Sequence, residues 1–240
     1  MNLIERLKLR QVIKKFKRKV NEKERAYLLS AIKEGQTVID VGAHVGAFSY
    51  FMRQAVGDTG KVYAFEPQSM PYQLLLQHKQ RLHWDNVTVL NLALSDSKGT
   101  VKLHIPSHKG KADTESATIL DHSDRNLYTT ETISTETIDN FCKEYGLAPG
   151  FLKIDVEGNE LKVLQGGMET IKTYSPKVFV EIEARHCGKE QGYKTLQFLT
   201  DLGYKGWFIL ENELVSLQQF DFDIYQVKGG LYCNNFIFEK

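Results

Sequence analysis

The chain has 240 residues, of which 42% are hydrophobic and 25% are charged, which suits one well-packed α/β domain and leaves little room for two. No apolar stretch approaches the about 20 residues that span a bilayer, and the basic N-terminus lacks the apolar segment of a secretory signal, so we expect a cytoplasmic protein with reduced cysteines. The net charge is +1, but residues 21–240 carry −6, and this slightly acidic body argues against a nucleic-acid partner.

The first predicted element is a basic amphipathic helix over residues 1–21. Residues 1–20 contain eight Lys and Arg residues and a single acid, so this segment has a charge of +7. Apolar side chains recur among the basic ones, from Leu3 through Phe16 to Val20. Such a helix could lie on the inner face of an anionic membrane, pack on a partner or dock on its own domain. The sequence leaves these alternatives and the oligomeric state open.

Residues 22–240 are predicted to form one domain in which strands and helices alternate. Asn21 and Glu24 make a capping-box pattern at the start of a helix that ends at Gly35. Alternation of strands and helices implies right-handed crossovers and a parallel sheet. The next predicted elements are strands at 37–41, 61–65 and 87–90 and helices at 48–56 and 70–82.

A polar insertion at about 105–130, flanked by strands near 100–105 and 129–135, interrupts this alternation. The alternation then resumes, and the end of the chain is rich in strands. We expect a Rossmann-like, doubly wound, mostly parallel sheet with antiparallel C-terminal strands. The later predicted elements are helices at 137–145, 159–172 and 190–202 and strands at 151–155, 177–183, 204–210, 213–217 and 232–238.

The first candidate site is the glycine turn that follows the strand ending in Asp40-Val41. Gly42 and Gly46 would let the backbone turn sharply and approach a ligand closely. Glu66 ends the next strand, where an acid can accept hydrogen bonds from ribose hydroxyls. The turn lacks the G-x-G-x-x-G pattern of dinucleotide sites, and Asp40 would repel a pyrophosphate. Asp40 would attract the ammonium group of S-adenosylmethionine, directly or through water, so we predict this cofactor rather than NAD.

Several segments resemble the FkbM-type methyltransferases: VIDVGAHVGAFS (38–49), VYAFEP (62–67), NLALSD (91–96), LKIDVEGNELKVLQGG (152–167), VFVEIE (178–183) and NNFIF (234–238). The resemblance spans about residues 36–238. It implies a class I methyltransferase fold and transfer of a methyl group to hydroxyls of macrolides, sugars and related metabolites.

The same resemblance implies which residues hold the cofactor. The turn would cradle its methionine end, Glu66 would bind the ribose, and Asn91 to Ala93 would lie beside the adenine. This chain has Leu92 where many class I enzymes have an acid, so Asn91 or Asp96 could bind the adenine amino group instead. The turn residues in the predicted cofactor site are Asp40, Gly42, Ala43, His44 and Gly46.

The second candidate site is Lys153-Ile154-Asp155-Val156-Glu157. Strand alternation would send Lys153, Asp155 and Glu157 to the same side, at the carboxyl end of a strand where ligands bind. Two carboxylates and an amine beside the cofactor could position a hydroxyl and take its proton, with Asp155 in contact with the cofactor as well. The alternative is a structural ion pair between Lys153 and Glu157, with only Asp155 facing the substrate.

A third cluster follows the strand predicted at 177–183. Glu181 and Glu183 would share one face, and His186 could act as a base, although a lone histidine after a strand is more often a surface residue. Asp155 and Glu181 could instead bind a divalent cation. Because the chain has no dense His/Asp ligand pattern, we expect no metal.

These patterns together predict an S-adenosylmethionine-dependent O-methyltransferase acting on a carbohydrate or secondary metabolite, with a small-molecule or glycan acceptor. Two alternatives remain: a catalytically silent S-adenosylmethionine-binding protein and an NAD-dependent oxidoreductase.

Overall fold

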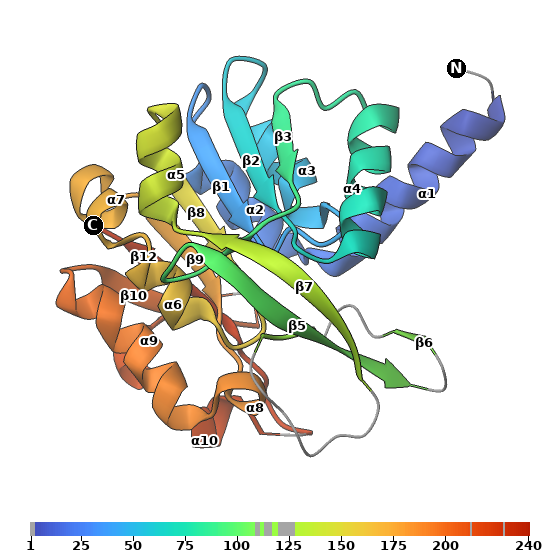
Figure 1. The fold of residues 1–240 in the computed structure, drawn as a ribbon. Coiled ribbons are helices and arrows are strands. Elements are labelled where there is room, and N and C mark those ends of the chain that lie inside the picture. Colours follow the sequence, from blue (N-terminus) through green and yellow to red (C-terminus); the bar gives the residue numbers. More distant parts are fainter. Residues whose placement is uncertain (1–2, 109–110, 113–116, 120–127, 212, 228) are drawn as a thin grey trace.

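The computed structural model describes residues 3–108, 111–112, 117–119, 128–211, 213–227 and 229–240. Its centre is an eight-stranded sheet with helices on both faces (Figure 1). The strands of this sheet are β1 (Thr37–Val41), β2 (Lys61–Phe65), β3 (Val87–Leu90), β8 (Pro149–Ile154), β9 (Lys177–Glu181), β10 (Lys205–Leu210), β11 (Glu213–Ser216) and β12 (Asn235–Glu239).

The strand order is β11-β10-β12-β9-β8-β1-β2-β3. Neighbouring strands in the run β9-β8-β1-β2-β3 are parallel. Strand β12 pairs antiparallel with β9 on one side and with β10 on the other, and β10 pairs antiparallel with β11. This confirms the predicted α/β fold with a mostly parallel sheet and antiparallel C-terminal strands. The central strands β1, β8 and β9 are buried on both faces, which is why they read as nearly continuous apolar runs.

Two groups of helices cover the two faces of the sheet. On β1, Val38 contributes to the core with the first group, whereas Ile39 and Val41 contribute to the core with the second, because successive side chains point to opposite faces. The first group is α1 (Leu3–Lys19), α2 (Glu22–Ala31), α3 (Ala47–Val56) and α4 (Ser69–Arg81). The second group is α5 (Ile138–Tyr145), α6 (Glu160–Gln165), α7 (Met168–Tyr174) and α9 (Lys189–Asp201).

Helix α1 packs on its own domain through its second half. Phe16 and Val20 are fully buried, and the Phe16 ring contacts the rings of Tyr50 and Trp84. The first turns of the helix extend away from the domain (Figure 1), and Leu7 is 50% exposed. Docking on the domain therefore explains the apolar side chains in the second half of this segment, such as Phe16 and Val20. In the described part of the chain, no helix is long and apolar enough to cross a membrane.

Two local predictions have different outcomes. The capping box is confirmed, because Asn21 Oδ1 accepts a hydrogen bond from the Glu24 backbone and Glu24 Oε2 accepts one from the Asn21 backbone. The single helix predicted over 159–172 is wrong, since Gly166 and Gly167 separate α6 from α7. A Cβ atom on Gly166 would lie 2.0 Å from the backbone oxygen of Ser95, so the chain passes too close there for any larger residue.

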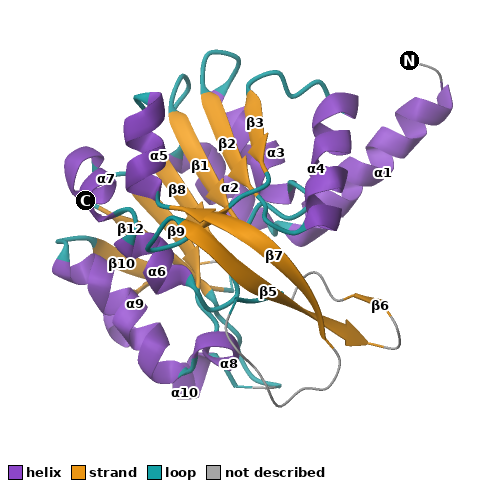
Figure 2. Cartoon of the chain, in the orientation of Figure 1, coloured by secondary structure: helices purple, strands orange, loops and turns teal. Residues whose placement is uncertain are grey.

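The polar insertion predicted at 105–130 is partly strand. Strands β5 (Gly99–His108) and β7 (Tyr128–Glu136) extend into it and pair antiparallel, with β4 (Ala93–Leu94) and β6 (Lys111–Ala112) beside them in a second sheet. Figure 2 shows this hairpin lying across the end of the parallel sheet. Leu103, Ile105 and Ile133 form a small apolar core on it. Residues 109–110, 113–116 and 120–127 of the insertion lie outside the described part.

Short elements that the sequence did not predict complete the fold. They are α8 (Ala184–Cys187), α10 (Phe222–Tyr225) and a 3₁₀ helix at Leu217–Gln219. All three cysteines are free thiols; Cys142 and Cys233 are buried and Cys187 is half-buried.

Candidate active site

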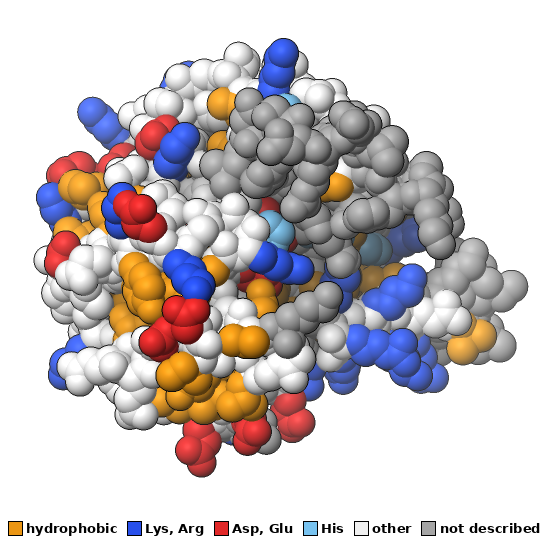
Figure 3. Space-filling model, turned by 90° about the horizontal axis from the view of Figure 1, so that it is seen from below, with side chains coloured by type: hydrophobic (Ala, Val, Ile, Leu, Met, Phe, Trp, Pro, Cys, Tyr) orange, Lys and Arg blue, Asp and Glu red, His pale blue; other side chains and the backbone are white. Residues whose placement is uncertain are grey.

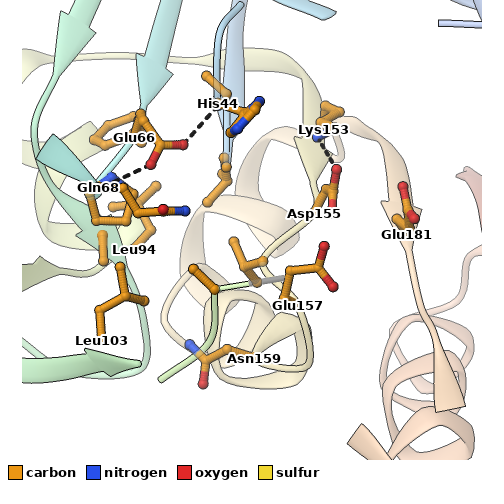
Figure 4. A pocket seen from close by; sticks show the side chains of 18 of the residues that line it. His44, Glu66, Gln68, Leu94, Leu103, Lys153, Asp155, Glu157, Asn159 and Glu181 are labelled. Carbon is orange, nitrogen blue, oxygen red and sulfur yellow. Dashed lines mark hydrogen bonds and ion pairs between the residues drawn. The ribbon is translucent and has the colours of Figure 1, made fainter. Parts of the chain in front are cut away.

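A cavity of about 500 Å³ opens at the carboxyl ends of β1, β2, β8 and β9, beneath the β5–β7 hairpin (Figure 4). Its volume lies in the range of small-molecule sites, which is roughly 300–1,000 Å³. The predicted site residues that line it are Gly42, Ala43, His44, Glu66, Ala93, Lys153, Asp155, Glu157 and Glu181. The predicted residues that do not line it are Asp40, Gly46, Asn91, Asp96 and His186.

Glu66 at the end of β2 is held by the backbone of two loops. Its carboxylate accepts hydrogen bonds from the backbone N–H of His44 and from that of Gln68, both at 2.8 Å (Figure 4). Only 3% of Glu66 is exposed, and this burial raises its pKa to about 7. The glycine turn after β1 and the acid after β2 therefore form one unit on the cavity wall.

The glycines of the turn are required mainly by packing against protein atoms. Both have positive φ, +77° for Gly42 and +87° for Gly46. A Cβ atom on Gly42 would lie 1.8 Å from the backbone oxygen of Asp155, and one on Gly46 would lie 2.4 Å from Leu75 Cδ1. Gly42 thus brings the turn against the loop after β8, and Gly46 lets α4 approach α3.

A buried charge cluster lies between β1 and β8. Lys153 Nζ is 2.9 Å from Asp155 Oδ2, 4.0 Å from Asp40 Oδ1 and 4.7 Å from the centre of the Phe48 ring. Asp40 is fully buried, and its other oxygen accepts a hydrogen bond from the Ser49 hydroxyl. Burial raises the pKa of Asp40, against the opposing effects of Lys153 and Ser49. Asp40 therefore supports Lys153 from behind the cavity wall.

The alternative ion pair between Lys153 and Glu157 is not formed. Lys153 pairs with Asp155, whereas Glu157 Oε2 lies 2.9 Å from His186 Nε2. Strand alternation does not explain the position of Glu157, because β8 ends at Ile154 and Glu157 has a positive φ of 54°. Glu157 therefore lines the cavity from the loop after β8 and not from the strand itself.

His186, which is part of α8, lies between the carboxylates of Glu157 and Glu183. Its Nε2 atom is 2.9 Å from Glu157 Oε2 and 3.4 Å from Glu183 Oε2. Burial opposes its charge, but the two carboxylates raise the pKa of His186 to about 9. An imidazole that is protonated at neutral pH is poorly suited to accept a proton from a substrate.

Glu181 and Glu183 share one face, as predicted, and Asn234 bridges them. The Asn234 side-chain amide donates to Glu181 Oε1 at 2.5 Å and to Glu183 Oε1 at 2.7 Å. Burial and the negative charge of Asp155 raise the pKa of Glu181 well above its usual value. Sequence reasoning assigned no role to Asn234, although it lies in the NNFIF segment that carries the resemblance.

In the described part of the chain, no group of three or more His, Cys, Asp or Glu residues is arranged to hold a metal ion.

The comparison with known families agrees with this geometry. The model of the methyltransferase FkbM domain matches residues 40–205, which include the glycine turn and the Asp155 loop. The chain belongs to the FkbM methyltransferase family.

Solved structures show that this FkbM family member has the fold of class I S-adenosylmethionine-dependent methyltransferases. The FkbM methyltransferase of Methylobacillus flagellatus KT matches with a TM-score of 0.55 and 16% identity, over 90% of this chain and 50% of that one. A putative O-methyltransferase of Klebsiella pneumoniae matches with a TM-score of 0.51 and 12% identity, over 96% and 87% of the two chains. The precorrin-6y C5,15-methyltransferase of Geobacter metallireducens GS-15 has a TM-score of 0.52 and 10% identity, over 92% and 88%.

These identities relate the folds alone, and the chain spans half the length of the Methylobacillus flagellatus protein. No protein with a curated description matches this chain.

The two residues suggested for the adenine amino group do not line the cavity of this FkbM family member. Asn91 donates its side-chain amide to the backbone oxygens of Glu66 and Pro67 and so joins the ends of β3 and β2. Asp96 is exposed and accepts a hydrogen bond from the Ser97 hydroxyl. Asn159, which sequence reasoning missed, is buried and lines the cavity.

Proposed function

We propose that this chain is an S-adenosylmethionine-dependent O-methyltransferase that acts on a hydroxyl of a carbohydrate or secondary metabolite. The observation that carries the proposal is one cavity with Glu66 at one end and the Asp155–Glu181 carboxylates, beside buried Lys153, at the other. This pairing suits a ligand with a ribose at one end and a cationic centre at the other.

The residues present fit the cofactor in both size and charge. Glu66 would accept hydrogen bonds from the ribose hydroxyls, and its carboxylate is already oriented by two backbone N–H groups. Asp155 and Glu181 would lie beside the positive ammonium and sulfonium groups. Apolar side chains of Leu92, Leu94 and Leu103 offer a wall for the flat adenine.

The chemistry needs little from the protein beyond alignment and exclusion of water. Bound S-adenosylmethionine supplies a methyl group on a positively charged sulfur. The acceptor hydroxyl would approach from the side of Asp155 and Glu181, which can orient it by hydrogen bonding and receive its proton. The β5–β7 hairpin, with Leu103 and Ile133 on the cavity wall, would shield the reacting groups from water.

Calorimetric titration with S-adenosylmethionine, and separately with NAD, tests the cofactor. We expect binding of the former only, and binding of NAD alone would overturn the proposal in favour of an oxidoreductase. A panel of sugars, glycans and metabolites with labelled cofactor then tests methyl transfer. Transfer to a hydroxyl supports the proposal, whereas binding without transfer to any acceptor favours a catalytically silent protein. EDTA in the same assay should leave the rate unchanged, since the proposed reaction uses no metal.

We also propose that α1 brings the enzyme to anionic lipid at the inner face of a membrane. The described Lys and Arg side chains of α1 from Arg10 to Lys19 are exposed, and Figure 3 shows basic side chains gathered at one side of the molecule. Lys19 at the end of this helix also lines the cavity. Basic residues near an anionic surface each contribute about 1 kcal/mol to binding, and exposed Leu7 could enter the interface.

A further inference from the structure

Three carboxylates line the catalytic end of the cavity, and their partners differ (Figure 4). Asp155 has the ammonium of Lys153 at 2.9 Å, and Glu157 has the imidazole of His186 at 2.9 Å. Glu181 has no cationic side chain within 4.0 Å among the residues that the structure describes, and its hydrogen-bond partner there is the neutral amide of Asn234. A carboxylate paired with a cation is a weak proton acceptor, because protonation would forfeit the ion pair.

We infer that Glu181 accepts the proton of the acceptor hydroxyl and that Asn234 positions Glu181 for this step. The inference rests on the proposed function. In the transfer, the hydroxyl oxygen forms a bond to the methyl carbon, and the carbon–sulfur bond breaks with its electron pair staying on sulfur. The O–H proton moves to Glu181, so a neutral thioether, a methyl ether and a protonated carboxyl group result.

The position of Asn234 is fixed from several sides. Its backbone oxygen accepts a hydrogen bond from the Ile182 backbone at 2.8 Å, and its side-chain oxygen accepts one from Asn235 Nδ2 at 3.2 Å. The side-chain amide group of Asn234 then donates one hydrogen bond to Glu181 Oε1 and one to Glu183 Oε1. Glu181 Oε2 makes no hydrogen bond to the described part of the chain and is available to a substrate hydroxyl.

Glu183 anchors the other end of this bridge. The guanidinium of Arg185 and the imidazole of His186 both pair with Glu183, and burial is outweighed by these two groups and the Asn234 amide, which together lower the pKa of Glu183 to about 2. Glu183 thus stays ionised, and Asn234 connects it to Glu181 through one hydrogen bond to each carboxylate. The neighbouring carboxylates therefore have distinct tasks: Glu183 anchors and Glu181 exchanges a proton.

The charges around Glu181 favour a change of protonation when a cation binds. Burial and nearby negative charge raise the pKa of Glu181, and the positive cofactor would lower it, so cofactor binding should leave Glu181 ionised. Methyl transfer makes the sulfur neutral, so the pKa of Glu181 would rise again as the hydroxyl proton arrives, whereas Asp155 keeps the ammonium of Lys153 throughout. The titratable groups that act on Glu181 are Lys153 from β8, Asp155 and Glu157 from the following loop, Glu183 beyond β9 and Tyr232 before β12.

The number of protons released when S-adenosylmethionine binds can be measured by calorimetry in buffers of different ionisation enthalpy. This measurement needs no acceptor. The wild type should release protons on binding near neutral pH, and Glu181→Gln should release fewer, because Glu66, with a pKa of about 7, also exchanges a proton in this range. Equal release by Glu181→Gln and the wild type would overturn the inference alone. Absence of cofactor binding by the wild type would overturn the proposed function and this inference with it.

Asn234→Ala tests positioning, and Gln226→Ala is its matched control. Gln226 also bridges these segments through hydrogen bonds of its side-chain amide with the backbone of Ile182, Ala184 and Cys233. Within the described residues, none of its hydrogen bonds goes to a carboxylate. Asn234→Ala should shift the pH of maximal proton release upward, because the carboxylate loses a hydrogen-bond donor. Gln226→Ala should leave this pH unchanged even if it lowers thermal stability. Equal shifts in both variants, or none in either, would overturn the positioning role.

Turnover gives a second readout on any acceptor found with labelled cofactor. Glu181→Gln should lower the rate of methyl transfer by about 10²–10⁴-fold, the usual effect of losing a general base. Asn234→Ala should lower it less and move the acidic limb of its pH profile upward. A Glu181→Gln rate within a few-fold of the wild type would contradict the assignment.

Discussion

The ammonium of Lys153 lies 2.9 Å from the carboxylate of Asp155, and only 2% of the lysine side chain is exposed. The same ammonium is the nearest cation to fully buried Asp40, at 4.0 Å. Removing one partner of a buried ion pair leaves an uncompensated charge, which commonly costs about 3–5 kcal/mol. Lys153 therefore links the stability of the sheet to the chemistry of the site.

Lys153→Met should lower the free energy of unfolding at pH 7 by about 3–5 kcal/mol. Urea denaturation measures this loss. Lys194→Ala is the control, because Lys194 pairs with Glu190 on the surface of α9, where ion pairs contribute about 0–1 kcal/mol. Similar losses in the two variants would mean that the buried pair adds no more than a surface pair.

Asp155→Asn should lower turnover far more than it weakens S-adenosylmethionine binding. The amide keeps the shape of the side chain but loses the charge that pairs with Lys153 and orients the acceptor hydroxyl. Initial rates on an acceptor identified with labelled cofactor, together with calorimetric affinity, separate the two effects. Turnover within a few-fold of the wild type would reduce Asp155 to a structural residue.

Glu66→Gln should weaken S-adenosylmethionine binding by about 1.5–3 kcal/mol, the value of a charge-assisted hydrogen bond, with little change in stability.

Asp40→Ala should change the stability of the protein, which a role in charge pairing with the cofactor alone does not predict. Because Asp40 is buried behind the cavity wall against Ser49 and Lys153, its loss should lower the melting temperature as well. Calorimetry and thermal unfolding of both variants test this, and unchanged affinity in both would remove the cofactor assignment.

His186 should make stability depend on alkaline pH. Its pKa is raised in the folded state to about 9 from an ordinary 6.5, so its contribution is complete below about pH 6.5 and is lost as the pH rises through about 9. The difference in unfolding free energy between the wild type and His186→Gln should therefore shrink by about 3 kcal/mol between pH 6 and pH 10. A difference that stays constant over this range would show that His186 does not exchange its proton there.

Full-length protein should sediment with anionic vesicles at low salt and remain in solution at high salt, because the attraction is screened. Deleting residues 1–20 is a poor test, since Phe16 and Val20 belong to the core and Lys19 lines the cavity. Replacing exposed Arg10, Lys14 and Lys17 with Gln removes charge and keeps those contacts. Equal sedimentation of this variant and the wild type, or none by either, would leave α1 as a helix that docks on its own domain.

Local patterns were sufficient for much of this protein. The bounds of β1, β2 and β3 were predicted to the residue, because short runs of buried apolar side chains between turn residues identify parallel strands. The capping box at Asn21 was equally readable, since its interactions stay within one turn of helix. The order of these elements and the FkbM resemblance then indicated the fold and the cofactor class.

The tertiary structure decided which charged groups meet. Spacing along the chain predicted that Lys153, Asp155 and Glu157 face the same side and left an ion pair between Lys153 and Glu157 as the alternative. In the structure Glu157 has a positive φ and lies beside His186, and Lys153 pairs with Asp155. Gly166, at the break between α6 and α7, lies against the backbone of Ser95, which is far away in sequence. Asn234 reaches Glu181 only because β12 inserts antiparallel beside β9. Ion pairs and carboxylate bridges depend on distances of a few ångströms between separate strands, and no periodicity within a single strand encodes them.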